Sequence, residues 1–348
     1  MDKKPLIPLK FLLKLETALI IAISFFLLHT FGKKEQDAES VEEKSSESFE
    51  AAEVSEVKNG VFFDSEIFKV TKKLIQNSKE SVVIATYTYS KSPLTEILEQ
   101  KQKEGVKVKV LAGKNRDGHV PRFDFFENKQ KNGIYHPKFM VFDSKGVLIS
   151  SSNISSEKSA SNSAVFFENA PAAAKILEEE VEDSFAQNFQ RRCETGCETE
   201  IGTIIFNPGK GCILAKNEFS KAEKSIKGGI YTFTSKNPVV TGLKNALKKN
   251  IYVSIVVDNW RGNDGKIVNK RALNYLSSKG ATLRFDEPEQ KNETLFHHKF
   301  AVIDSKTTLF GSMNWTASGC YKNREIVVIN RDPQIAKQFE NYFDSFNR

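Results

Sequence analysis

The stretch His136–Asp143, HPKFMVFD, recurs 161 residues further along the chain as His297–Asp304, HHKFAVID. In each stretch a histidine is followed by a lysine two residues later and by an aspartate five residues after that, around an apolar run that predicts a buried β-strand. A shuffled chain of this composition would contain this frame about 0.03 times. Two occurrences therefore indicate an internal repeat.

The repeat extends far beyond these two stretches. Each copy begins with a β-rich run, Val82–Tyr89 or Gly229–Thr234, followed by a Ser-Lys-x-Pro turn, a helical pattern and a second strand. The turns lie 145 residues apart and the histidines 161, so the second copy holds 161 − 145 = 16 more residues in this interval. Strands that alternate with helices predict an α/β protein of two pseudo-symmetric halves, each an α/β sandwich.

The chain before the repeat has a different composition. Residues 1–34 hold six lysines against two acids, and residues 17–32 are uncharged, which predicts a signal peptide or an N-terminal membrane anchor. Residues 35–58 hold nine acids against two lysines, which predicts an acidic flexible linker. We predict a first repeat domain at 59–190 and a second at 191–348, and we expect the catalytic part to be extracytoplasmic and membrane-anchored, or secreted.

The remainder of the chain is basic and able to form a core. The whole chain carries +7, and its first two segments carry +4 and −7, so residues 59–348 carry +10. A basic surface suits a phosphate-bearing partner, although it also serves solubility. The 39% hydrophobic content excludes a wholly disordered chain, a collagen-like chain and a multi-span membrane protein.

Small-residue turns follow both aspartates after six residues, namely Ser150–Asn153 (SSSN) and Gly311–Asn314 (GSMN). The combined pattern resembles the signature of the phospholipase D superfamily, H-x-K-x4-D-x6-G-S-x-N, and the second copy matches it at every position. The resemblance covers about residues 59–348. It implies two α/β/α sandwich halves with one active site at their interface, and we expect a monomer because both motifs lie in one chain.

The resemblance implies a metal-independent phosphodiesterase that needs no cofactor. One histidine would attack phosphorus to form a phosphohistidine, and the other would protonate the leaving alcohol and then activate water. His136 and His297 are the two candidates, and the sequence does not assign their roles. Lys138 and Lys299 would hold the phosphoryl oxygens as point charges. Further hydrogen bonds to these oxygens are expected from Ser151, Asn153, Ser312 and Asn314.

Three carboxylates are expected to support the site. Asp143 and Asp304 are expected to pair behind the motif without touching substrate. Glu325, eleven residues after Asn314, is expected to orient a catalytic imidazole. The residue eleven positions after Asn153 is Ala164, so the first copy is expected to lack this carboxylate, and a degenerate, inactive first half is an alternative.

The remaining histidine beside the motif and the four cysteines carry weaker signals. His298 would point away from His297 on a strand, so packing or a contact at the rim is expected. The cysteines form no zinc pattern. The candidate disulfides, which an exported chain permits, are Cys193–Cys197 and Cys212–Cys320, with free thiols as the alternative.

Two substrate classes are compatible with these observations. A membrane tether beside a basic catalytic body favours a phospholipid, whose head-group ester would be hydrolysed to phosphatidate and an alcohol. An endonuclease that cleaves DNA or RNA by the same two-histidine mechanism is the alternative. Transfer to a second lipid and a non-enzymatic module that binds polyanions rank below these two.

Overall fold

The computed structural model describes residues 56–130, 132–154, 161–188, 190–258, 269–286 and 295–346. The predicted signal or anchor segment, residues 1–34, and all but the last three residues of the predicted linker lie outside the described residues. Within the described ranges, no helix has the length and apolar character needed to cross a membrane.

In the residues that the structure describes, the first repeat forms a seven-stranded sheet with three helices. Its strands are β1 Gly60–Phe63, β2 Ser81–Tyr89, β3 Lys107–Asn115, β4 Asp124–Glu127, β5 Phe139–Phe142, β6 Gly146–Ser150 and β7 Ser163–Phe167. Its helices are α2 Ser65–Asn77, α3 Pro93–Lys103 and α4 Pro171–Phe185. The strand order in the sheet is β1-β7-β6-β5-β2-β3-β4.

Over its described ranges, the second repeat forms an eight-stranded sheet. Its strands are β8 Cys197–Thr199, β9 Gly202–Asn207, β10 Ser225–Ile230, β11 Tyr252–Asp258, β12 Thr282–Asp286, β13 Lys299–Ile303, β14 Thr307–Gly311 and β15 Glu325–Asn330. Its helices are α5 Gly211–Lys221, α6 Pro238–Lys248, α7 Lys270–Ser277, α8 Ala317–Tyr321 and α9 Pro333–Ser345. The strand order is β12-β11-β10-β13-β14-β15-β9-β8.

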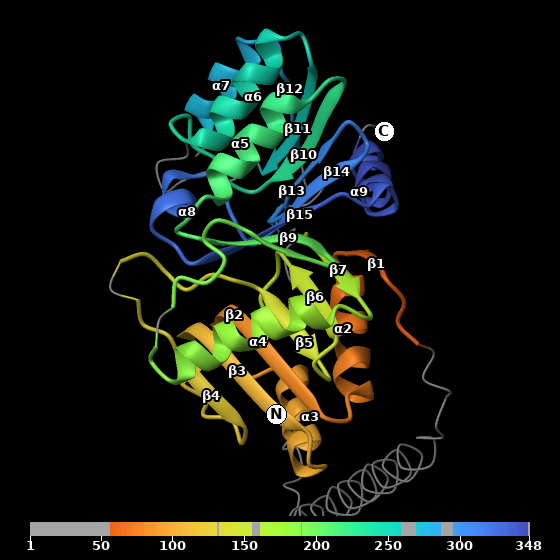
Figure 1. Ribbon diagram of the computed structural model, residues 1–348, viewed down its shortest axis with the longest axis vertical. Helices are drawn as coiled ribbons and strands as arrows, with labels where there is room; N and C mark the ends of the chain where they lie inside the picture. Colours follow the sequence, from red (N-terminus) through yellow and green to blue (C-terminus); the bar gives the residue numbers. More distant parts are fainter. Residues whose placement is uncertain are drawn as a thin grey trace, which may run out of the picture. The chain divides into compact units, whose positions relative to one another are not determined.

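The two strand orders show the pseudo-symmetry directly. Strands β4, β3, β2, β5, β6, β7 and β1 of the first sheet correspond in order to β12, β11, β10, β13, β14, β15 and β9 of the second, and β8 is an addition at the edge. Helix α7 lies in the interval where the second copy is longer. The predicted pair of α/β halves is therefore confirmed, and the two sheets occupy the lower and upper parts of the molecule in Figure 1.

The two Ser-Lys-x-Pro turns begin equivalent helices. Pro93 starts α3, and the Thr95 hydroxyl accepts a hydrogen bond from the Ser92 backbone N–H at 3.1 Å. Pro238 starts α6, and the Asn237 side chain accepts a hydrogen bond from the Val240 backbone N–H. Proline suits the first helical position because its missing N–H would have no partner there, and the side-chain caps satisfy the next donors.

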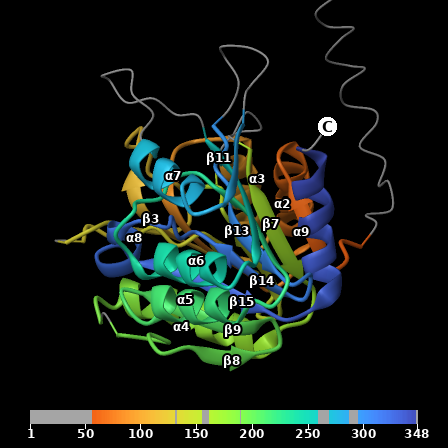
Figure 2. The same ribbon diagram turned by 90° about the horizontal axis from the view of Figure 1, so that it is seen from above.

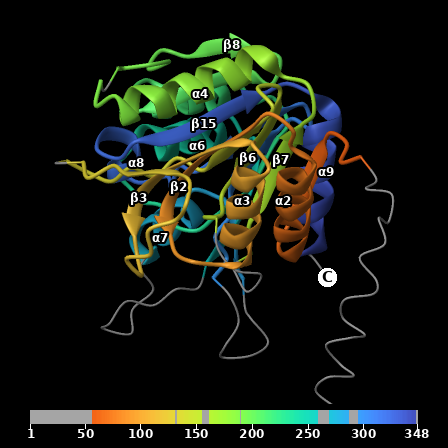
Figure 3. The ribbon, with the colours of Figure 1, turned by 90° about the horizontal axis from the view of Figure 1, so that it is seen from below.

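Apolar packing joins the layers. Helices α2 and α3 cover the outer face of the first sheet, and α5 and α6 cover the outer face of the second. Figures 2 and 3 show these helices from above and below. A central core lies between the sheets and contains the inner faces of α4 and α9 together with Phe139, Phe206 and Phe300. Because this core draws on both repeats, the two motifs are held at the edge of one packed body.

Both candidate disulfides are present. Cys193, in the segment between α4 and β8, bonds to Cys197 at the start of β8, and Cys212 of α5 bonds to Cys320 of α8. The alternative of free thiols is therefore wrong. The predicted domain boundary at 190/191 falls in the same segment between α4 and β8 and stays a prediction.

Candidate active site

The sheet topology brings the two motifs to the same place. In the first half, His136 precedes β5, which pairs antiparallel with β2. In the second half, His297 precedes β13, which pairs antiparallel with β10. Backbone hydrogen bonds then join the halves. The N–H of His136 donates to the Arg324 carbonyl at 2.9 Å, and the N–H of His297 donates to the Ser161 carbonyl at 2.7 Å. Each histidine is thus positioned by the opposite half.

Glu325 orients the histidine of the other repeat. Its Oε2 accepts from His136 Nδ1 at 2.7 Å and from the Ser312 hydroxyl at 2.5 Å, and its Oε1 accepts from Asn323 at 3.1 Å. The carboxylate is fully buried. Since Nδ1 is held by this bond, Nε2 is the ring nitrogen of His136 that remains for chemistry.

Asn162 occupies the equivalent position in the first repeat. Its Oδ1 accepts from His297 Nδ1 at 3.0 Å and from the Ser151 hydroxyl at 2.9 Å. The backbone N–H of Ser151 donates to the carbonyl of Ser163, the residue after Asn162. In the same way, the backbone N–H of Ser312 donates to the carbonyl of Ile326, the residue after Glu325. Asn162 and Glu325 therefore occupy equivalent positions. An amide therefore stands where the second repeat has a carboxylate.

This result corrects the expected position of the missing carboxylate. Counting eleven residues from Asn153 led to Ala164, but the structural equivalent of Glu325 is Asn162, only nine residues after Asn153. The count was wrong because the connection into β7 is two residues shorter than the connection into β15. Ala164 instead pairs with Ser150 inside the sheet.

The two serines support the orienting residues. A serine hydroxyl has one proton to donate. Ser151 gives its proton to Asn162 and Ser312 gives its proton to Glu325. Each hydroxyl thus helps to hold Asn162 or Glu325 in place, and the phosphate-binding role of the two serines stays a prediction.

The lysines and asparagines of the motifs lie beside the histidines. Lys138 Nζ donates to the His136 carbonyl at 2.9 Å, and Lys299 Nζ donates to the His297 carbonyl at 2.6 Å. The Asn153 Oδ1 accepts from two backbone amides of β2, at 3.2 Å each, which fixes the orientation of its amide group. Asn314 Oδ1 is buried and has no hydrogen-bond partner among the described residues.

Two tyrosines also belong to the site, and the sequence reasoning did not single them out. The Tyr87 ring lies 5.2 Å from the His136 ring, and Lys138 Nζ is 5.8 Å from its centroid. The Tyr231 ring lies 4.9 Å from the His297 ring, and Lys299 Nζ is 5.3 Å from its centroid. The signal that could have revealed them is the repeat itself, since both lie within the first strand pattern of their copy.

Burial disfavours the charged forms of the histidines and lysines at this site. Desolvation lowers the pKa of His136 to about 4, although Glu325 opposes the shift, and desolvation lowers the pKa of Lys138 to about 7. The pKa values of His297 and Lys299 are lowered well below their usual range, first by burial and then by neighbouring cationic groups. A bound anion would offset each of these penalties.

Asp143 and Asp304 lie at the other end of the motif strands. The Asp143 carboxylate accepts from the backbone amides of residues 79–81, and the Asp304 carboxylate accepts from those of residues 223–225. Each one ties the end of β5 or β13 to the loop that enters β2 or β10. Both therefore make structural contacts away from the histidines.

His298 is a core residue. Its side chain is fully buried among aromatic rings, and its Nε2 lies 3.0 Å from the Tyr342 hydroxyl. The packing interpretation is confirmed, and a contact at the rim of the site is excluded.

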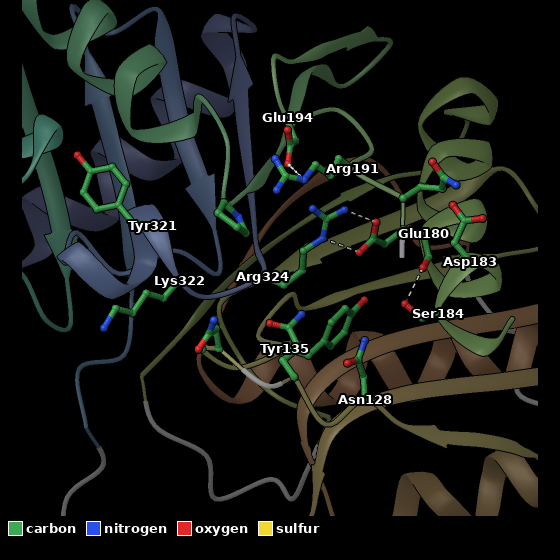
Figure 4. A pocket seen from close by; sticks show the side chains of 15 residues that line it. Asn128, Tyr135, Glu180, Asp183, Ser184, Arg191, Glu194, Tyr321, Lys322 and Arg324 are labelled. Atoms are coloured by element: carbon green, nitrogen blue, oxygen red, sulfur yellow. Dashed lines mark hydrogen bonds and ion pairs between the residues drawn. The ribbon is translucent and has the colours of Figure 1, made fainter. Parts of the chain in front are cut away.

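A polar cavity of about 660 Å³ lies beside α4 and the segment that precedes β15 (Figure 4). Tyr135 and Arg324 line it, and they immediately precede His136 and Glu325 in the chain. Arg324 forms a buried ion pair with Glu180 of α4. The residues that line the cavity include three carboxylates and three cationic side chains, so these formal charges cancel. The carboxylates are Glu180, Asp183 and Glu194, and the cationic side chains are Arg191, Lys322 and Arg324.

Comparisons with known proteins place this site in a family. The model described as "Cardiolipin synthase, PLD-like domain" matches residues 71–191 and 215–346. The chain is 28% identical to the mitochondrial cardiolipin hydrolase of Xenopus laevis over 123 residues, which are 35% of this chain and 54% of that protein. It is 31% identical to a phospholipase D of Rickettsia conorii over 138 residues, 39% of this chain and 64% of that protein. The chain thus spans about half the length of the curated relatives it matches.

A solved structure supports the fold over most of the chain. The phosphatidylserine synthase of Haemophilus influenzae aligns with a TM-score of 0.64 at 14% identity, and the alignment covers 84% of this chain and 86% of that one. At this identity the likeness concerns the fold alone. With the family model matched in both repeats and the two motifs joined at one site, the chain belongs to the phospholipase D superfamily.

Proposed function

We propose that this protein is a phosphodiesterase that hydrolyses the head-group ester of a phospholipid to phosphatidate and an alcohol. The observation that supports this proposal most strongly is the convergence of two histidine–lysine pairs from opposite repeats, each histidine held at Nδ1 by an orienting residue. The relatives named cardiolipin hydrolase and phospholipase D support a lipid diester as substrate.

The proposed reaction proceeds in two displacements. The Nε2 of one histidine attacks phosphorus, the bond from phosphorus to the head-group oxygen breaks, and the second histidine gives its proton to that oxygen. Water then attacks the phosphohistidine and gives a proton to the second histidine, while the phosphorus–nitrogen bond breaks. Lys138 and Lys299 are proposed to hold the non-bridging oxygens, and Asn153 and Asn314 are proposed to bind them through their amide groups.

The location of the protein forms part of the proposal. The uncharged segment at 17–32 behind a basic start supports export with a cleaved signal or a retained anchor. The two disulfides support an oxidising compartment, because such bonds are rare in cytosolic proteins. A membrane tether would place the site beside its lipid substrate. The presence of both motifs in one chain supports a monomer.

The test uses the full chain in mixed micelles with EDTA. Phosphatidylcholine, phosphatidylglycerol and cardiolipin are offered separately, and single- and double-stranded DNA are offered in parallel. Release of phosphatidate from at least one lipid, with intact DNA, supports the proposal and metal-independent chemistry. DNA cleavage without lipid turnover would contradict it and establish the nuclease alternative.

A further inference from the structure

The cavity beside α4 contains a buried hydroxyl without a partner. Tyr135 lines the cavity and is 1% exposed, and its Oη has no hydrogen-bond partner among the described residues. Figure 4 shows the Tyr135 side chain directed toward the α4 side of the cavity. A buried polar group without a partner is costly, so a ligand that bonds this hydroxyl would remove that cost.

The second repeat has an apolar ring at the equivalent position. Tyr135 directly precedes the motif histidine of the first repeat and forms an isolated bridge with Arg324. Phe296 directly precedes the motif histidine of the second repeat and forms an isolated bridge with Ser161. The Phe296 ring packs edge-on against Phe346, with the centroids 5.5 Å apart. Since phenylalanine is sufficient for packing at this position, packing alone does not account for the Tyr135 hydroxyl.

The carboxylates in the cavity wall already have cationic partners. Each lies within ion-pair distance of a guanidinium, namely Glu180 with Arg324, Asp183 with Arg192 and Glu194 with Arg191. The other charged residue that lines the cavity, Lys322, is exposed to solvent. A charged ligand inside the cavity would therefore be desolvated beside charges that are already paired, which is unfavourable.

The other polar groups of the wall are neutral. They are the amides of Asn128, Gln130, Asn132 and Gln190 and the hydroxyls of Tyr135, Ser184 and Tyr321. Amide and hydroxyl side chains both donate and accept hydrogen bonds without carrying charge. Alcohol groups of a ligand do the same, and a volume of about 660 Å³ is in the range of small-molecule pockets.

We propose that this cavity binds a neutral ligand with several hydroxyl groups, a polyol or a single sugar unit, and that the Tyr135 hydroxyl is one of its contacts. The same chemistry occurs in a free polyol and in the polyol head group of a lipid. The cavity is separate from the candidate active site, because the motif histidines and lysines do not line it. Binding here does not depend on the proposed phosphodiesterase function.

The first test observes the Tyr135 ring without turnover. The chain has eight tyrosines, so protein labelled at the tyrosine Cζ gives a small set of NMR signals, and Tyr135→Phe identifies the signal of Tyr135. The full chain is kept in a detergent that has no sugar head group. Titration with glycerol or myo-inositol should shift the Tyr135 signal to saturation, and the signal of the exposed Tyr252 should not move.

The second test measures the contribution of the wall to affinity. Tyr135→Phe should weaken myo-inositol binding about threefold to tenfold, the loss expected for one neutral hydrogen bond. Asn128→Leu, which replaces a buried amide by an apolar group of similar size, should weaken binding at least as much. The matched control Tyr252→Phe removes a hydroxyl from an exposed position on β11 and should leave the affinity unchanged.

Stability without ligand separates binding from a structural role. Tyr135→Phe should not lower the free energy of unfolding in urea, because its hydroxyl loses no partner and phenylalanine occupies the equivalent position in the second repeat. A less stable Tyr135→Phe would show that the hydroxyl serves the fold, and would overturn the proposal.

The source of the polyol is tested with short-chain phosphatidylinositol, titrated into His297→Ala so that hydrolysis does not consume it. Tighter binding than that of free myo-inositol, weakened by Tyr135→Phe, would assign a lipid head group. Binding that is no tighter, or that Tyr135→Phe does not weaken, would assign a free polyol.

Inorganic phosphate and ethanolamine are the charged probes. A Tyr135 signal that either of them shifts as strongly as myo-inositol does would overturn the neutral class of ligand. A signal that no probe shifts would show that the cavity holds only water, and would overturn the proposal while leaving the proposed function intact. Failure to hydrolyse lipid, with the Tyr135 titration as expected, would overturn the proposed function and keep this site.

Discussion

Four groups that can carry positive charge, His136, Lys138, His297 and Lys299, share one buried site. Burial disfavours their charged forms, so the empty site holds fewer protons than the same residues would hold in water. Anion binding should restore them, because each cation gains a partner. Ligand binding and proton uptake are therefore linked at the scale of single residues.

This linkage predicts a pH-dependent affinity for a simple anion. Lys138, with a pKa of about 7 in the empty site, is mostly protonated below that pH and must take up a proton above it. The affinity for tungstate, whose charge is constant in this range, should fall as the pH rises from 6 to 9. Isothermal titration calorimetry in two buffers of different ionisation enthalpy should show proton uptake at pH 8. Equal affinity at both ends of the range would contradict the depressed lysine pKa.

Stability should depend on pH through His136. Its pKa falls from 6.5 to about 4 on folding, so the folded protein prefers the neutral ring. The contribution is fully present above pH 6.5 and is lost as the pH falls through 4, by about 3 kcal/mol in total. Urea unfolding of the parent and of His136→Gln between pH 7.5 and 4.5 checks this. A difference between the two proteins that stays constant over this range would contradict it.

At the scale of elements, the turn that precedes the orienting residue is built differently in the two repeats. Gly311 has a φ of +139°, and a Cβ there would lie 2.3 Å from the Ile326 carbonyl oxygen. Ser150 occupies the equivalent position without a positive φ, and its hydroxyl accepts from the Ser152 amide at 2.9 Å. Glycine is thus required in one turn and not in the other.

The matched substitutions follow from this difference. Gly311→Ala should lower the free energy of unfolding by about 2 kcal/mol or more, because the backbone at β14 and β15 must move, and should disturb Ser312 and Glu325. Ser150→Gly should lower it by about 1 kcal/mol or less. Chemical denaturation of both variants makes the comparison, and equal losses would show that the two turns are not different.

The sequence was sufficient to predict the repeat and most of its strands, because the apolar periodicity and the motif spacing are local signals. The strand expected at Gly229–Thr234 forms at Ser225–Ile230 instead. The residue that binds the Nδ1 atom of each histidine was not predictable from these local signals. Glu325 and His136 are 189 residues apart, and Asn162 and His297 are 135 apart, so only the paired sheets bring them together. The position of Asn162 was missed because a connection shortened by two residues shifts a counted position without leaving a pattern.

At the scale of the whole molecule, polar contacts as well as the shared core join the repeats. Arg324 directly before β15 pairs with Glu180 of α4 in two hydrogen bonds, and its guanidinium lies 4.7 Å from the centroid of the Phe206 ring. Its carbonyl accepts the N–H of His136. One residue of the second repeat therefore anchors both a helix and a histidine of the first.

Breaking this pair should destabilise the protein strongly. Glu180→Gln leaves the guanidinium buried without its carboxylate, and should lower the free energy of unfolding by about 3–5 kcal/mol. The double variant Glu180→Met/Arg324→Met should recover a large part of this loss, since two apolar side chains leave no charge unpaired. Urea denaturation of both variants tests the expectation, and a double variant less stable than Glu180→Gln would contradict it.

In the proposed mechanism, one histidine from each repeat acts on the same phosphorus. The most direct measurement is the rate of phosphatidate release from phospholipid micelles in EDTA by the parent chain, His136→Ala, His297→Ala and the double variant. Because the two residues act as one unit, each single variant should lose about 10³-fold or more, and the double variant should be little worse than either single one. A single variant that keeps the parent rate would contradict the claim.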